Sequence, residues 1–121
     1  MENKIVTTFG IDFELWKVFQ KKLIDNAVTD AKNGSTIPKG SKVVSGLLKE
    51  FLDNKLTVDL FTEESSVKDS YIAGFHIDES IWLQLDIFLA EERARFIGNK
   101  EKQKFLNKGN IIVKLIRQYI K

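Results

Sequence analysis

The feature of this sequence that most constrains its fold is an internal repeat. Residues 9–12 (Phe-Gly-Ile-Asp), followed by Trp16, recur 66 residues later as residues 75–78 (Phe-His-Ile-Asp), followed by Trp82. The same offset pairs further apolar residues: Leu15 with Ile81, Phe19 with Leu85 and Leu23 with Leu89. The same order of residues occurs twice, which predicts two similar structural units.

The repeat divides the chain into two units and a linker. Residues 39–47 resemble residues 108–116 at an offset of 69, so the second copy has three extra residues in its middle loop. We therefore predict a first unit at residues 1–54, an acidic linker at residues 55–69 and a second unit at residues 70–121. Four apolar linker residues would pack on the core if the linker acts as a strap: Leu56, Val58, Leu60 and Phe61.

Both units begin with a segment whose residues alternate between an inner and an outer face, with the two-residue period of a half-buried strand. In residues 5–11 one face carries Ile5, Thr7, Phe9 and Ile11, and the other carries Val6, Thr8 and Gly10. In residues 71–77 the corresponding faces carry Tyr71, Ala73, Phe75 and Ile77, and Ile72, Gly74 and His76. We expect the two segments to form one antiparallel pair, because a lone strand leaves both of its edges unbonded.

A helix is expected directly after each strand. Asp12 and Asp78 stand at N-cap positions, where a short carboxylate accepts hydrogen bonds from the free amides of the first turn. The apolar stripes of these helices are Leu15, Trp16, Phe19, Leu23 and Ala27 in the first unit, and Ile81, Trp82, Leu85, Leu89 and Phe96 in the second. We place the helix ends near Lys32 and Gly98.

A second helix is expected in each unit after a short turn-forming segment. It begins near Pro38 or Lys39 in the first unit and near Lys108 in the second. The apolar faces contain Val43, Val44, Leu47, Leu48 and Phe51, and Ile112, Val113, Ile116 and Ile120.

The composition excludes several kinds of site. The 121 residues include no cysteine, which excludes disulfides, thiolate metal sites and a cysteine nucleophile. The chain is 43% hydrophobic with a single proline, so we expect a packed and largely helical core. No apolar signal segment and no run of about eighteen apolar residues occurs. We therefore expect a cytoplasmic protein that does not associate with membranes.

The net charge of +2 is small, but the charges are unevenly distributed. Residues 32–49 contain four lysines and no acid, and residues 98–121 contain seven basic residues against Glu101. Residues 56–69, between them, contain four acids against Lys68. This pattern is compatible with two phosphate-facing patches on one molecule, and also with an ordinary solvated surface.

The order of a strand, an Asp-capped helix, a short loop and a second helix that opens with Gly-Ser or Gly-Asn resembles the ribbon-helix-helix family of DNA-binding proteins. This family includes the Arc and MetJ repressors, and the resemblance covers residues 4–54 and 70–121. It implies a mainly α-helical fold with one two-stranded antiparallel ribbon, in which two units interlock within one chain as a pseudodimer. It also implies that the ribbon enters the major groove of double-stranded DNA.

The tandem arrangement is similar by architecture to relaxosome accessory proteins of conjugative plasmids. This similarity implies a transcriptional regulator or an accessory factor in plasmid transfer or maintenance. The implied partners are double-stranded DNA, further copies of the chain on adjacent sites, and a relaxase or another plasmid protein.

The family resemblance assigns two sets of DNA-contacting residues. Those that face the bases are Val6, Thr8, Gly10, Ile72, Gly74 and His76. Those that bind phosphates at the start of the second helices are Lys39, Gly40, Ser41, Lys42, Lys108, Gly109 and Asn110. The ribbon departs from the family pattern because it offers mainly Thr8 and His76 in place of the longer polar side chains that read purine edges.

Other functions fit the residues less well, and we expect neither enzyme activity nor a cofactor or metal. His76 is the only histidine, and no nucleophile motif accompanies it. Trp16 and Trp82 occupy matched positions on apolar helix faces, which favours core packing over stacking on single-stranded nucleic acid. The competing function is a helical protein-interaction module, antitoxin-like or used for dimerisation, that binds no DNA. The modest net charge and the apolar residues of the ribbon support this alternative.

Overall fold

The computed structural model describes residues 4–32, 40–62 and 70–121. Strand β1 (Lys4–Asp12) leads directly into α1 (Phe13–Lys32), which is followed in the first half by α2 (Gly40–Leu52). The second half contains β2 (Ser70–Asp78), α3 (Glu79–Arg95), the short α4 (Lys100–Gln103) and α5 (Lys108–Tyr119). The expectation of a mainly helical protein with a small antiparallel sheet is confirmed for these residues.

Strands β1 and β2 pair in an antiparallel register that is symmetric with respect to the sequence repeat. The offset of 66 residues relates Lys4 to Ser70 and Asp12 to Asp78, so it matches both strand boundaries. Thr8 and Gly74 are related by this offset and are also opposite each other in the sheet. A local two-fold axis of the strand pair therefore passes between Thr8 and Gly74, and the offset of the sequence repeat also relates the two strands.

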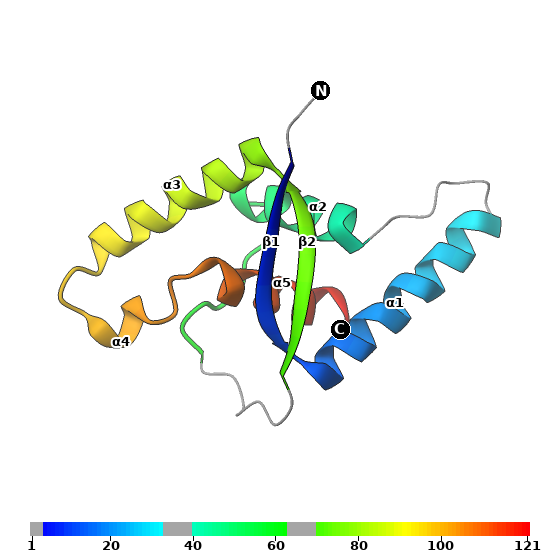
Figure 1. Cartoon of the computed structure of the whole chain (residues 1–121). Helices are drawn as coiled ribbons and strands as arrows, with labels where there is room; N and C mark the ends of the chain where they lie inside the picture. The colour runs from blue at the N-terminus through cyan, green and yellow to red at the C-terminus, as the bar shows by residue number, and fades with distance from the viewer. Residues whose placement is uncertain (1–3, 33–39, 63–69) are drawn as a thin grey trace.

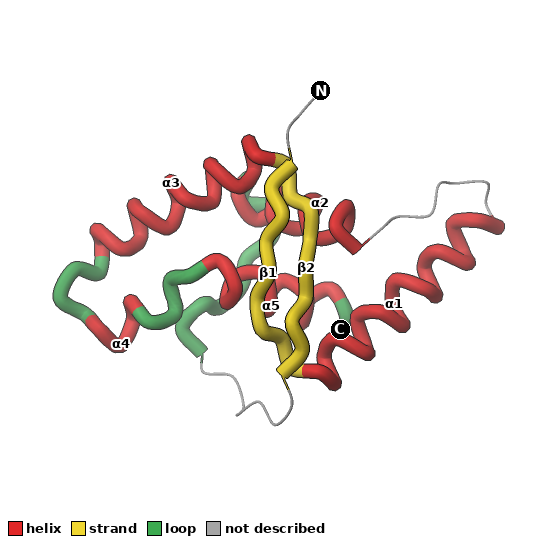
Figure 2. The backbone as a smooth tube through the Cα atoms, in the orientation of Figure 1, coloured by secondary structure: helices red, strands yellow, loops and turns green. Residues whose placement is uncertain are grey.

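The helices are arranged around the strand pair. Figure 1 shows α1 and α3 extending to opposite sides of the strands, with α2 and α5 behind them. In Figure 2 the two strands form the only sheet among the described residues, and the helices lie behind it and to either side. Helix α2 packs against β2, α3 and α5, and α5 also packs against β1.

The core lies between the inner face of the strands and the four longer helices. Ala73, Phe75 and Ile77 of β2 and Ile11 of β1 are buried, as the alternation predicts. The helices contribute Leu15, Phe19, Leu23, Val44, Leu48, Ile81, Leu85, Leu89, Ile111, Ile112, Leu115 and Ile116. Tyr71 was expected on the inner face but is 39% exposed, because it lies at the end of the pair, where its ring stacks on Trp16. Trp16 and Trp82 are half-buried and pack against the core.

The connector after α2 is part of the core up to the last described residue before the gap. Leu60 is buried, and Leu56, Val58 and Phe61 pack partly buried against the same cluster. Asn110 of α5 holds this segment through its side-chain amide, which donates to the carbonyl of Leu60 at 3.1 Å. Residues 55–62 therefore act as a strap, while residues 63–69 of the predicted acidic linker lie outside the described part of the chain.

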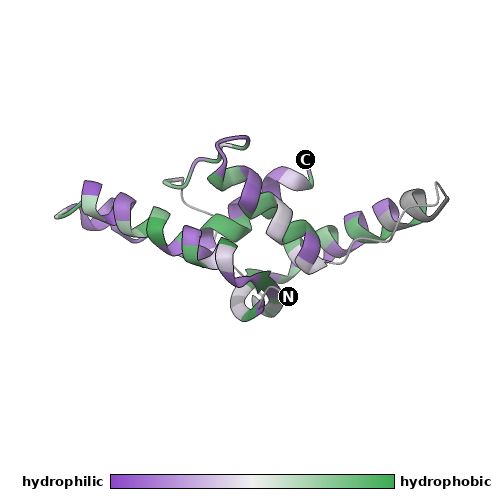
Figure 3. Cartoon of the chain, turned by 90° about the horizontal axis from the view of Figure 1, so that it is seen from above, coloured by the Kyte–Doolittle hydropathy of each residue, from purple (hydrophilic) through white to green (hydrophobic). Residues whose placement is uncertain are grey.

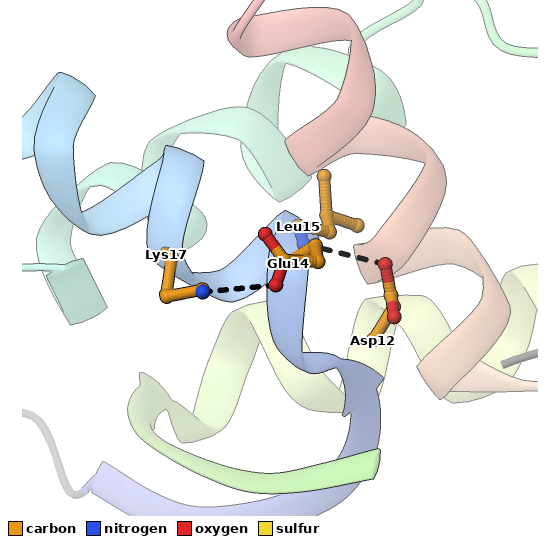
Figure 4. Close-up of polar contacts among 4 residues, drawn as sticks. All are labelled: Asp12, Glu14, Leu15 and Lys17. Atoms are coloured by element: carbon orange, nitrogen blue, oxygen red, sulfur yellow. Dashed lines mark hydrogen bonds and ion pairs between the residues drawn. The ribbon is translucent and has the colours of Figure 1, made fainter. Parts of the chain in front are cut away.

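The two aspartates expected to cap the first helices behave differently. The amide of Leu15 donates to Asp12 Oδ2 at 3.4 Å, and Lys17 forms an ion pair with Glu14 in the same turn (Figure 4). Asp78 is the N-cap residue of α3, as predicted, but its carboxylate accepts no hydrogen bond from that helix. The backbone of Asp78 has φ −57° and ψ 133°, whereas Asn107, which does cap α5, is extended at φ −144° and ψ 157°.

Candidate nucleic-acid interface

The outer face of the strand pair carries all six residues that the sequence assigns to base contacts. Since the inner residues of both strands face the core, the alternating set points to solvent. Val6 is 63% exposed and Ile72 67%, and Thr8, Gly10, Gly74 and His76 are exposed as well. Across the register Val6 faces His76, Thr8 faces Gly74 and Gly10 faces Ile72. The outcome is a narrow surface with polar groups at Thr8 and His76.

Gly74, at the centre of this surface, has no side chain that projects from the strand. A methyl group built on Gly74 would meet Thr8 Cγ2 at 3.6 Å and the carbonyl oxygen of Thr7 at 3.8 Å, which are ordinary contacts. The fold therefore does not require glycine at this position. What the missing side chain changes is how closely another molecule can approach the β2 backbone.

The start of α2 is joined to the strand pair by a hydrogen bond. The backbone amide of His76 donates to Ser41 Oγ at 2.9 Å. Gly40 lies at the same contact between α2 and β2. A Cβ built on Gly40 would be 3.4 Å from Leu23 Cδ1 and 3.6 Å from the ring of Phe75. The first turn of α2 contains no acidic residue, and Lys42 is exposed there. This helix end is therefore suited to an anion near β2.

Lys39, the remaining residue assigned to phosphate at α2, lies outside the described residues.

The start of α5 differs from the start of α2 in the hydrogen bonds that its residues make, and the phosphate roles expected there remain predictions. The amide of Asn110 donates to Asn107 Oδ1 at 2.8 Å, because Asn107 is the cap of this helix. The side chain of Asn110 donates inward to the carbonyls of Leu60 and Phe105. Asn110 therefore stabilises the fold, and Gly109 beside it is half-buried.

Lys108 also has partners within the protein. Its ammonium group forms an ion pair with Asp86 and lies 4.0 Å from the centre of the Trp82 ring. Both partners belong to α3, so Lys108 links α5 to that helix. Sequence reasoning missed this role because Asp86 and Trp82 are more than twenty residues away in the chain.

Within the basic C-terminal stretch, α5 packs against β1, but the end of the stretch lies away from the strand pair. Figure 3 shows the C-terminus on the opposite side of the molecule from the strands, which are seen nearly end-on beside the N-terminal label. Lys104 of this stretch pairs with Glu101, and Lys102 lies over the ring of Phe96. The expectation of two phosphate-facing patches therefore remains a prediction.

Two findings on the described residues bear on other functions. They contain no group of three His, Cys, Asp or Glu side chains placed to hold a metal ion. Among them, no helix combines the length and the apolar composition that a membrane crossing requires.

Comparison of the chain with protein-family models, with curated proteins and with solved structures finds no match. The interpretation of the outer face therefore depends on its own geometry and chemistry.

Proposed function

We propose that this chain is a double-stranded DNA-binding protein that inserts β1 and β2 as a ribbon into the major groove. In this proposal residues 1–54 and 70–121 are two interlocked ribbon-helix-helix units, and the protein is a transcriptional regulator or an accessory factor in plasmid transfer or maintenance. The observation that carries the proposal is the exposed outer face of the strand pair, with its two-fold register about Thr8 and Gly74.

The packing of the helices supports the interlocked arrangement. Helix α2 comes from the first half of the chain but contacts β2 and α3 of the second half. In return, α5 of the second half contacts β1 of the first. Each half buries apolar surface against the other, as expected for units too small to form a core alone.

The dimensions and chemistry of the outer face fit a major groove. A groove about 12 Å wide admits a two-stranded ribbon. Gly10 and Gly74 allow the ribbon to approach the base edges closely, and the side chains of Thr8 and His76 supply hydrogen-bonding groups. Val6 and Ile72 are suited to contact with thymine methyl groups.

Salt dependence of duplex binding tests the proposal. We expect the affinity for a labelled DNA duplex, measured by fluorescence anisotropy, to fall steeply with salt, because neutralised phosphates release counterions. The double variant Thr8→Glu/His76→Glu introduces two carboxylates on the outer face and is expected to abolish binding. The control is Ala94→Glu, which adds a carboxylate at an exposed site near the end of α3. Equal binding by all three proteins would refute the proposal.

The alternative of a protein-interaction module has one observation in its favour. The two helices that extend from the molecule expose large apolar side chains, namely Val18, Ile24 and Val28 on α1, and Leu83 and Ile87 on α3. Such residues can form a docking surface for a protein. This alternative predicts no duplex affinity at any salt concentration, so the same titration distinguishes the two functions.

A further inference from the structure

Helix α3 has a second apolar face, opposite the face that packs on the core. The helix extends away from the strand pair, as Figure 1 shows, and buries Ile81, Leu85 and Leu89. Four exposed apolar residues recur on its other side at intervals of four, three and four residues, and we call them the α3 stripe: Leu83, Ile87, Ala90 and Ala94. This spacing is that of a helix that packs along another helix.

The order of residues in the α3 stripe, two large and then two small, is complementary to itself. When two copies of α3 lie antiparallel, Ile87 of one is opposite Ala90 of the other, and Leu83 is opposite Ala94. Each layer then joins a large side chain to a small one, so the helices pack evenly without a cavity or a clash. A parallel pair would place Ile87 opposite Ile87 and Ala90 opposite Ala90, and the layers would differ in width.

The charges beside the α3 stripe favour the same orientation. In the antiparallel pair Asp86 lies beside Arg93 of the second copy, whereas in a parallel pair it would lie beside Glu91. Asp86 and Arg93 already bind Lys108 and the Leu106 carbonyl within the chain. Exposed charge pairs of this kind contribute little affinity, so their effect here is on the orientation of the two helices.

The corresponding face of α1 lacks this complementarity. The offset of the repeat relates Leu83 and Ile87 to Lys17 and Lys21 of α1. Lysines therefore stand where the α3 stripe has its two large apolar residues. Self-pairing is thus a property of α3 and not of both helices that extend from the molecule.

We infer that a second copy of the chain docks on the α3 stripe, with the two α3 helices antiparallel. The stripe spans about 17 Å of helix, which is short for a stable interface. The pair is therefore weak, with a Kd of about 10–100 µM. The inference goes beyond the proposed function, because the pair forms without DNA.

Sedimentation equilibrium of the full chain without DNA, at concentrations that bracket this Kd, tests the inference. Ile87→Ala leaves a small residue opposite a small one, and Ala90→Ile a large residue opposite a large one. We expect each substitution to weaken association about tenfold. The double variant Ile87→Ala/Ala90→Ile again places a large residue opposite a small one, so its Kd should return to within about threefold of that of the natural sequence.

Ile24→Ala is the matched control, because Ile24 is 62% exposed on α1 at the position that the repeat relates to Ala90. We expect it to leave association unchanged. All three substituted positions are exposed, so the variants keep the core, and far-UV circular dichroism verifies their helix content.

Four outcomes would overturn the inference. A chain that stays monomeric throughout the concentration range would mean that a different protein covers the α3 stripe. Association that no variant changes would place the contact elsewhere. A double variant as weak as the single variants would refute the antiparallel register, and an equal loss with Ile24→Ala would indicate unspecific apolar contact. Failure of the chain to bind duplex DNA leaves all of these measurements unaffected.

Discussion

Gly74 lies opposite Thr8 at the centre of the outer face. Adding a methyl group at this position is expected to change duplex affinity much more than the free energy of unfolding. Because the methyl of Gly74→Ala would make only ordinary contacts, we expect the free energy of unfolding to change by less than about 0.5 kcal/mol. The same methyl would hold the ribbon away from the bases, so duplex affinity should fall about five- to tenfold, or roughly 1 kcal/mol. Anisotropy titration and urea unfolding measure the two effects.

Gly46 provides the matched control for this substitution. It is exposed within α2, and a Cβ built on it meets no atom within 4 Å. Gly46→Ala should stabilise the helix by up to about 1 kcal/mol without changing duplex affinity. If Gly74→Ala and Gly46→Ala had the same affinity for DNA as the natural sequence, the outer face would not approach the bases at its centre.

Asp59 gives the strap a stabilising contribution that depends on pH. Its folded-state pKa lies below 3.8, because the Thr62 hydroxyl and the Phe61 amide donate to the charged carboxylate. A lowered pKa stabilises the folded state fully above pH 3.8, and the contribution is lost as pH falls through the folded-state pKa. We expect Asp59→Asn to have a lower Tm than the natural sequence at pH 7, and this difference to shrink as the pH falls below 3.8 and through the folded-state pKa. A Tm difference that is constant from pH 7 to pH 2.5 would contradict this assignment.

At the scale of single elements, the first turn of α2 is the best-supported phosphate contact. We expect Lys42→Ala to weaken binding to all duplexes by a similar factor and to reduce the slope of log affinity against log salt by about one. Lys49→Ala is the control, because Lys49 is exposed in the last turn of the same helix. Equal effects of both substitutions on the salt slope would mean that Lys42 makes no specific phosphate contact and that the lysines of α2 act only through their overall positive charge.

The sequence predicted the elements that have a strong local period. The strands at 5–11 and 71–77 occur with one extra residue at each end, and α1 ends at Lys32 as expected. Both strands are followed without a gap by helices, as the positions of Asp12 and Asp78 indicate. These features depend on residues close together in the chain, so periodicity is sufficient to identify them.

The partners of individual polar side chains were not predictable in the same way. Lys108 and Asn110 occupy positions that the repeat relates to the start of α2, yet their side chains bind Asp86, Leu60 and Phe105 inside the protein. The bond between Ser41 and His76 was also missed, since it joins residues that are 35 positions apart. Such contacts follow from the packing of α2 and α5 and leave no periodic signal in the sequence.

At the scale of the whole molecule, the strand pair is symmetric in its backbone register and asymmetric in its surface chemistry. The two-fold register about Thr8 and Gly74 gives both strands equivalent positions. The outer residues at those positions differ, because Thr8 corresponds to Gly74 and Gly10 to His76. The two helix ends behind the strands differ as well, since α2 leaves Lys42 exposed while Lys108 at α5 is paired with Asp86. Two halves within one chain can differ in this way, whereas a homodimer presents identical residues on both halves.

The asymmetry predicts that the preferred DNA site is not a palindrome. Thr8 and His76 lie on different strands and are not related by the repeat, so each reads a base that the other half of the ribbon cannot read in the same way. We expect Thr8→Ala to relax sequence preference in one half-site and His76→Ala to relax it in the other, each at a cost of about 1 kcal/mol for the contacted base pair. Selection of binding sites from a randomised duplex library, repeated with each variant, measures both half-sites at once. A palindromic preferred site that both substitutions alter equally in its two halves would show that the DNA-binding unit is a symmetric dimer of chains.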